Sequence, residues 1–173
     1  MTEIVDPSPS QPAAPPSMPR GEHEDPRMPR LGRSAGFTGF IAGQWGEPER
    51  PAPVAEGAAG AAAAHRARLS SAYPGQAIVV AGGRAPVRVN DCYYDFRPHS
   101  DFVWLTGCTA EDAVLVMTPA GGGHDATLYL PAPFGPGEDG FFANAVHGEL
   151  WVGATPRLAG WERALDLPVR DLA

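Results

Sequence analysis

Side chains able to do chemistry gather in residues 88–107, which read R-V-N-D-C-Y-Y-D-F-R-P-H-S-D-F-V-W-L-T-G. Four apolar residues, 102–105, directly follow a polar set made up of Asp91, Asp95, Arg97, His99, Ser100 and Asp101. This combination predicts a β-strand that begins among charged side chains at the surface and continues into the hydrophobic core. Carboxylates and guanidinium groups form strong paired bonds. We therefore interpret Arg97 and Asp101 as a structural ion pair and not as catalysts.

The sequence contains no self-sufficient catalytic centre. None of the five histidines lies in an H-E-x-x-H arrangement, and there is no Cys/His cluster. His124-Asp125 and His147-Gly148-Glu149 are weak metal-ligand candidates, and polar residues beside turns explain both pairs better. Ser100 is interpreted as a backbone cap, because Asp101 beside it could not act as its base without a histidine. We assign no catalytic residue and no metal ligand to this chain.

Composition narrows the class of protein. The chain has 173 residues and a formal net charge of −7, and all 13 of its cationic side chains are arginine. The negative charge, without any basic patch, argues against a nucleic-acid partner. No stretch has the length of a membrane span, and the start lacks a secretory signal, so we expect a cytoplasmic protein. Cys92 and Cys108 form no metal or redox motif and fit buried thiols in a reducing cytosol.

The chain divides into an arm and one domain. Residues 1–33 hold eight prolines and almost no apolar run. Such a stretch cannot bury enough surface to offset its ordering entropy, so it is predicted to be a disordered Pro-rich arm. Residues 34–173 are predicted to form the folded domain.

Hydrophobic patterns in the domain predict alternating strands and helices. Helices are expected over 34–46, 57–71 and 141–146, and from Thr155 onward with Leu158, Trp161 and Leu165 on one face. Strands are expected over 77–81, 102–106, 113–117, 127–130 and 149–153, and from Val169. The segments 113–117 and 127–130 read as a hairpin. The predicted fold class is α/β, a mixed β-sheet flanked by helices.

The run at 88–107 resembles the N-terminal domain of Xaa-Pro aminopeptidase (aminopeptidase P), in the creatinase/prolidase superfamily. That family's pattern reads roughly R-S-x-D-x-x-Y-x-F-R-x-x-S-D-F-x-Y-L-T-G, then E-x-x-A-V-L-V, and later E-x-W-x-G. The matching residues are Arg88, Asp91, Tyr94, Phe96, Arg97, Ser100, Asp101, Phe102, 105–107, 113–116, 128–130 and 149–153. The resemblance is collinear over about residues 60–170.

Two departures from the family pattern have consequences. After Gly153 the family often has R-R or R-x-G, whereas this chain has Ala154-Thr155-Pro156-Arg157, so an arginine is missing or displaced. The resemblance also places the catalytic site, two divalent ions that are usually manganese, in a second, C-terminal domain. None of that domain's five ligands is present, so we expect a truncated product or gene fragment without activity of its own.

The resemblance implies roles for two residues in substrate binding. Asp91 matches an acid that faces the free amino end of the peptide, and the alternative is that it pairs with Arg88 or Arg97 to fix the loop. Trp151 matches a tryptophan that reaches toward a neighbouring subunit's active site, and the alternative is a core tryptophan. Arg88, Arg97 and Asp101 are interpreted as structural, with Tyr94 and Phe96 packed beneath them.

The function implied is the N-terminal domain of an enzyme that releases the residue preceding proline from peptides. The domain would serve homo-oligomer assembly and border the substrate site. Two alternatives remain open at this point: the corresponding domain of an Xaa-Pro dipeptidase (prolidase), and a free-standing, non-catalytic binding module.

Overall fold

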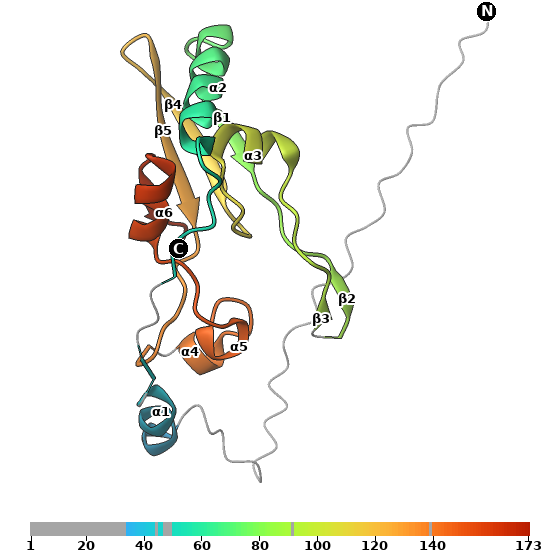
Figure 1. Ribbon diagram of the computed structural model, residues 1–173, viewed down its shortest axis with the longest axis vertical. Helices are drawn as coiled ribbons and strands as arrows, with labels where there is room; N and C mark the ends of the chain where they lie inside the picture. The colour runs from blue at the N-terminus through green and yellow to red at the C-terminus, as the bar shows by residue number, and fades with distance from the viewer. Residues whose placement is uncertain (1–33, 44, 47–49, 91, 139) are drawn as a thin grey trace, which may run out of the picture. The chain divides into compact units, whose positions relative to one another are not determined.

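The protein is described here from a computed structural model that covers residues 34–43, 45–46, 50–90, 92–138 and 140–173. The predicted arm, residues 1–33, lies outside the described residues. Two sheets form: a four-stranded sheet and a separate two-stranded ribbon (Figure 1). No helix among the described residues has the length and apolar character needed to cross a membrane.

The larger sheet has the strand order β1-β4-β5-β6. Its strands are β1 (Ile78–Ala81), β4 (Val114–Ala120), β5 (Gly123–Leu130) and β6 (Val169–Asp171). β4 pairs antiparallel with β1 and β5, and β6 pairs parallel with β5. The predicted mixed sheet and its β4–β5 hairpin are therefore confirmed.

The hairpin strands are longer than the sequence predicts. We expected Pro119 to follow the end of a strand, but β4 continues through it, and Pro119 pairs with His124. β1 pairs with β4 only between Ile78↔Met117 and Ala81↔Val114. Beyond Met117 that edge of β4 has no neighbouring strand among the described residues, so the N–H that proline lacks is not needed there.

Three helices cover one face of this sheet: α2 (Ala58–Ala72), α3 (Ser100–Thr106) and α6 (Leu158–Leu165). Alternate residues of β4, Leu115 and Met117, are buried, while Val114 and Val116 on the other face are only half-buried. Among the described residues, 12 buried ones form the core cluster, of which the largest completely buried are Phe102, Leu115, Met117, Leu128 and Leu165.

The strand predicted at 102–106 is wrong, because these residues belong to helix α3. Phe102, Leu105 and Thr106 are buried, and this spacing of three and one is that of a helix face. Asp101 lies in the first turn, where a carboxylate is favourable. Gly107 ends the helix at φ 72°, a left-handed conformation that glycine adopts without strain.

The remaining elements are short. α1 (Ala35–Ala42), α4 (Gly140–Ala143) and α5 (Glu149–Val152) are helices, and β2 (Val87–Val89) and β3 (Cys92–Tyr93) form the two-stranded ribbon. The strand predicted at 149–153 is therefore also wrong. β2 and β3, whose side chains are exposed, were not predicted from the sequence.

Candidate functional site

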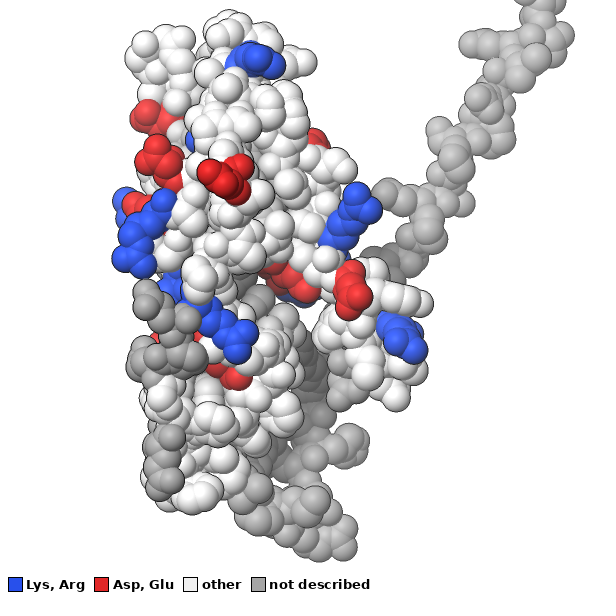
Figure 2. Space-filling model, in the orientation of Figure 1, with Lys and Arg blue, Asp and Glu red and all other residues white. Residues whose placement is uncertain are grey.

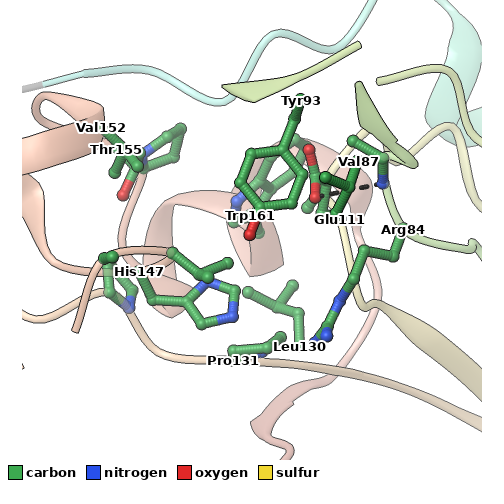
Figure 3. A pocket seen from close by; sticks show the side chains of 16 residues that line it. Arg84, Val87, Tyr93, Glu111, Leu130, Pro131, His147, Val152, Thr155 and Trp161 are labelled. Carbon is green, nitrogen blue, oxygen red and sulfur yellow. Dashed lines mark hydrogen bonds between the residues drawn. The ribbon is translucent and has the colours of Figure 1, made fainter. Parts of the chain in front are cut away.

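A cavity of about 430 Å³ lies where the β2–β3 ribbon, the end of β5 and the segment before α6 come together. Tyr93 of the ribbon points into it, opposite His147 and Leu130 (Figure 3). A volume of this size is typical of small-ligand sites. Most of the wall is apolar and consists of Ala85, Val87, Ala110, Leu130, Pro131, Pro133, Ala145, Val146, Val152, Pro156 and Trp161.

Charged groups lie along one edge of the cavity. Arg84 Nε donates to Asp112 Oδ1 at 2.8 Å and Arg84 Nη2 donates to Oδ2 at 2.7 Å. The hydrogen bond and the charge of this carboxylate raise the pKa of Arg84 above its ordinary value. His147 Nε2 lies 3.5 Å from the same Oδ2. Arg84 lies three residues before β2 and Asp112 two residues before β4, so these contacts connect the chain that enters the ribbon to the chain that enters the sheet.

One polar atom of the cavity wall lacks a protein partner. Thr155 Oγ1 is buried, and no other described residue forms a hydrogen bond with it. Buried hydroxyls are ordinarily hydrogen-bonded. Thr155 lines the cavity, so its hydroxyl is a group that a bound molecule or water could satisfy.

Trp151 lies on α5, in the stretch of residues 131–157 that carries α4 and α5 and is called the α4–α5 segment below. Its side chain is 57% exposed, so the alternative of a core tryptophan is wrong. The indole is nevertheless fixed: Nε1 donates to the carbonyl of Phe142 at 2.7 Å, and the two rings lie 5.7 Å apart. The ring of Phe37 in α1 packs against Phe142 in a T-shaped arrangement, with 5.3 Å between the ring centroids. An exposed but anchored aromatic side chain is suited to contact a partner or ligand.

The surface near Trp151 carries few charges. Figure 2 shows almost uniformly uncharged side chains over α1 and α4, and α1 contains no charged residue. Exposed large apolar residues of this region are Phe40, Trp45, Trp151 and Val152.

The start of α5 is held by an ion pair between the buried Glu149 and Arg157, whose side chain is 44% exposed. The Glu149 side chain is 5% exposed, and its Oε2 accepts a hydrogen bond from Arg157 Nη2 at 3.3 Å. Its Oε1 accepts from the Thr155 N–H at 3.1 Å. Arg157 Nη1 also donates to the carbonyl of Pro133 at 3.1 Å. The sequence has no arginine directly after Gly153, and Arg157 is the arginine that pairs with Glu149 in this chain.

The predicted site residues fall in different places. Asp91 lies outside the described residues, between β2 and β3. Arg88 and Arg97 are exposed, and no ion pair among the described residues joins Arg97 to Asp101. Asp101 Oδ1 instead accepts from the Phe102 N–H at 3.0 Å, because the segment is a helix start and not a strand mouth.

Packing around this run also differs from expectation. Tyr94 is 57% exposed, so its predicted packing is wrong. Phe96 is half-buried, but the Arg97–Asp101 pair beneath which it was expected to pack is not formed. Cys108 is fully buried as expected, but Cys92 is exposed on β3. Of the remaining tryptophans, Trp161 is buried in the core, and Trp45 and Trp104 are about half exposed.

The described residues contain no cluster of three groups able to hold a metal ion. His124 Nδ1 and Nε2 bond to Ser70 Oγ at 2.8 Å and to the Gln76 carbonyl at 2.6 Å. His147 and Glu149 turn to different partners, Asp112 and Arg157. The donors on the described part of the chain therefore do not fit the dinuclear manganese site that the resemblance implies for a separate domain.

The residues that shape this site were not identified from the sequence. Arg84, Tyr93 and Glu111 line the cavity, and Arg157 pairs with Glu149, yet none of them was proposed as a site residue. The carboxylates at 111 and 112 directly before an apolar run were the available signal for the Arg84 contact. The displaced arginine after Gly153 was the available signal for Arg157.

This architecture, a mixed sheet covered by helices and bordered by a ribbon, is found in known proteins. Residues 62–169 match the family described as "Aminopeptidase P, N-terminal domain". Xaa-Pro aminopeptidase 1 of Streptomyces coelicolor is 42% identical over 109 residues, 63% of this chain and 22% of the relative. Xaa-Pro aminopeptidase 2 of the same organism is 44% identical over 108 residues, 62% of this chain and 23% of the relative.

Solved structures show the same fold. The low-pH form of aminopeptidase P from E. coli aligns with a TM-score of 0.54 at 21% identity, over 68% of this chain and 25% of that one. Proline aminopeptidase P II from Yersinia pestis aligns with a TM-score of 0.52 at 22% identity, over 66% and 24%. The chain belongs to the aminopeptidase P N-terminal domain family. It spans about a fifth of the length of the curated relatives it matches.

Proposed function

We propose that this chain is the N-terminal domain of a manganese-dependent Xaa-Pro aminopeptidase, in which it borders the substrate site and takes part in oligomer assembly. The family match and the two Streptomyces relatives support the enzyme class. The observation that carries the proposed role is Trp151, a large apolar side chain that is anchored by Phe142 yet 57% exposed.

Trp151 is assigned to the proline side of the peptide. A flat indole face offers apolar contact to the pyrrolidine ring that follows the cleaved bond. The neighbouring residue, Val152, lines the 430 Å³ cavity, so the tryptophan lies at the border of a concave surface. The uncharged surface around α1 and α4 supports contact with another protein surface in the assembled enzyme.

Asp91 is assigned to the free amino end of the peptide. An ionised carboxylate can accept a charge-assisted hydrogen bond from an α-ammonium group, worth roughly 1.5–3 kcal/mol. An enzyme that removes only first residues needs such an anchor. The metal ions of the whole enzyme would supply the attacking water, and no residue described here is assigned to them.

The test uses an enzyme in which residues 62–169 replace the matching segment of Streptomyces coelicolor Xaa-Pro aminopeptidase 1. The chimera with the unaltered segment must cleave a Xaa-Pro-Xaa peptide in the presence of Mn²⁺. Asp91→Asn should then lower kcat/KM by roughly 10-fold to 100-fold, since that is the range of one charged hydrogen bond. Asp95→Asn, the same change at an exposed carboxylate in the same run, is the matched control.

Peptide variants distinguish the two roles. An N-acetylated peptide lacks the ammonium group, so the unaltered chimera and Asp91→Asn should handle it equally. Trp151→Ala should instead raise KM for every proline peptide. If Asp91→Asn leaves kcat/KM for free peptides unchanged, Asp91 fixes the loop and is not a substrate ligand.

The isolated 173-residue chain with Mn²⁺ and the same peptide should show no turnover. Measurable hydrolysis by the pure protein would contradict the proposal that the catalytic site lies in another domain.

Preference of the active enzyme for peptides longer than two residues favours the aminopeptidase over the dipeptidase alternative. Sizing chromatography with and without the catalytic domain tests assembly. A chain that forms a stable oligomer alone and does not bind that domain would favour a separate binding module.

We place the protein in the cytoplasm. Cys108 is a fully buried thiol, which suits a reducing compartment. Fractionation of the producing cell with an antibody to the chain tests this location.

A further inference from the structure

Helix α5, which carries Trp151, is a single turn of four residues, Glu149–Val152. So short a helix has no stability of its own, because the first turn fixes several residues for very few hydrogen bonds. The direction of Trp151 must therefore be set by contacts outside the helix. Phe142 accounts for one, the bond to the indole Nε1.

The second set of contacts converges on Glu149, the first residue of α5. Its backbone N–H donates to the carbonyl of Phe134 at 3.0 Å. Its buried carboxylate joins Thr155 through Oε1 and Arg157 through Oε2. A carboxylate this deeply buried is tolerated only with charged and hydrogen-bonding partners. Arg157 supplies the charge, and no other cationic side chain among the described residues forms an ion pair with Glu149.

Arg157 also contacts a third stretch of the chain, the residues that follow β5. Its Nη1 donates to the Pro133 carbonyl, and its guanidinium lies so close to Gly135 that a Cβ there would collide with it at 2.3 Å. One guanidinium therefore fixes three stretches to one another: the chain after β5, the start of α5 and the start of α6. Pro133, Val152 and Thr155 of these stretches all line the cavity.

We propose that Arg157 and Glu149 are positioning residues: together they set the direction of Trp151 and the shape of the adjoining cavity wall. Neither is proposed to touch the peptide, and the link to catalysis rests on the function proposed above for Trp151. A planar guanidinium suits this role, because it presents several donors in fixed directions.

The first test measures the environment of the Trp151 indole by fluorine NMR in the 173-residue chain, and it does not depend on enzymatic activity. Protein labelled with 5-fluorotryptophan gives a fluorine resonance for each of Trp45, Trp104, Trp151 and Trp161, and Trp151→Phe identifies one by its loss. Arg157→Ala should shift or broaden the Trp151 resonance and leave that of Trp104 in place. Arg163→Ala, an exposed arginine on the same helix, is the control and should leave Trp151 unchanged.

A second variant guards against loss of folding. Glu149→Gln keeps the side chain's size and its acceptor for the Thr155 N–H but removes the charge that holds Arg157. It should move the Trp151 resonance in the same way, and the double variant should add little to either single change, because both remove one interaction. If Trp151 stays in place in folded Glu149→Gln and Arg157→Ala, the inference is wrong.

The same changes in the active chimera separate the inference from the proposed function. Arg157→Ala should raise KM roughly threefold to tenfold, as Trp151→Ala does, with kcat little changed. Arg157→Lys should recover part of this loss, because one ammonium group reaches either Glu149 or Pro133 but not both. A shifted resonance with an unchanged KM would uphold the positioning role and reject the substrate role of Trp151.

Discussion

The helix-covered sheet and the α4–α5 segment are stabilised by different interactions. The sheet buries large side chains completely, among them Phe102, Leu115 and Leu165. The α4–α5 segment buries one aromatic ring, Phe141, and otherwise relies on hydrogen bonds: the Glu149–Arg157 pair and the Asn144 amide, whose Oδ1 accepts from two backbone N–H groups. The part with the stronger apolar core gives the fold its stability, and the other presents the exposed indole.

The largest effect should come from truncating the centre of the sheet's core. Phe102→Ala is expected to lower the free energy of unfolding by about 3–5 kcal/mol, because it removes a completely buried ring and leaves a cavity. The ring lies so close to β1 that a Cβ on Gly82 would come within 3.0 Å of it. Denaturant unfolding measures the change. A loss below about 1 kcal/mol would show that the core is not where the stability resides.

The core should also respond to alkaline pH. Burial raises the pKa of the Cys108 thiol to about 11 from an ordinary value of 9.0. The folded protein then keeps a proton that the unfolded chain releases above pH 9, so the free energy of unfolding falls as pH rises from 9 to 11. The fall approaches about 3 kcal/mol and is absent below pH 9, where both states hold the proton.

Cys108→Ala is the control for this pH dependence. All other ionisable groups are common to both proteins, so the difference between the two unfolding curves isolates the thiol. Parallel curves from pH 8 to 11 would mean that Cys108 is accessible to water.

A smaller effect is expected from the hydrogen bonds of the α4–α5 segment. Asn144→Ala leaves the N–H groups of Val146 and His147, now bonded at 2.9 and 2.8 Å, without their acceptor. We expect a loss of about 1–2 kcal/mol. Hydrogen exchange should speed up at these amides and not in β4. Acceleration throughout the sheet would show that the two parts unfold as one.

The smallest effect should come from Trp151. Because its side chain is more than half exposed, Trp151→Ala should change the free energy of unfolding by less than about 1 kcal/mol. Denaturant unfolding of Trp151→Ala and Phe102→Ala then compares the loss of an exposed aromatic residue with the loss of a buried one. A loss comparable to that of Phe102 would place Trp151 in the structural core.

These two means of stabilisation explain which predictions from the sequence succeeded. Apolar burial leaves a period in the sequence, which located β1, β6 and α6, while helix propensity located α2. The hairpin strands β4 and β5 were also found but were predicted too short. The hydrophobic pattern led to a wrong prediction at Phe102–Thr106. The continuous apolar run there resembled a strand, although the buried residues have helical spacing.

The α4–α5 segment leaves no such period, because its hydrogen bonds run from side chains to backbone atoms. E-L-W-V therefore resembled an extended strand. The turn that makes it a helix depends on Gly148, where a Cβ would lie 2.3 Å from the Asn144 carbonyl oxygen. The prominence of Trp151 was recognised only through the family pattern. The pairing of Glu149 with Arg157 required the fold, which brings residues eight positions apart together.

The turn between β4 and β5 has a practical consequence. Gly121 and Gly122 have φ values of 55° and 87°, and a Cβ on either would meet nothing within 4 Å. His124, bonded to Ser70 and Gln76, anchors the strand just beyond the turn. An epitope or a fluorescent label spliced between these two glycines would extend into open solvent from an anchored stem, which makes this tip a suitable handle for immobilising the protein.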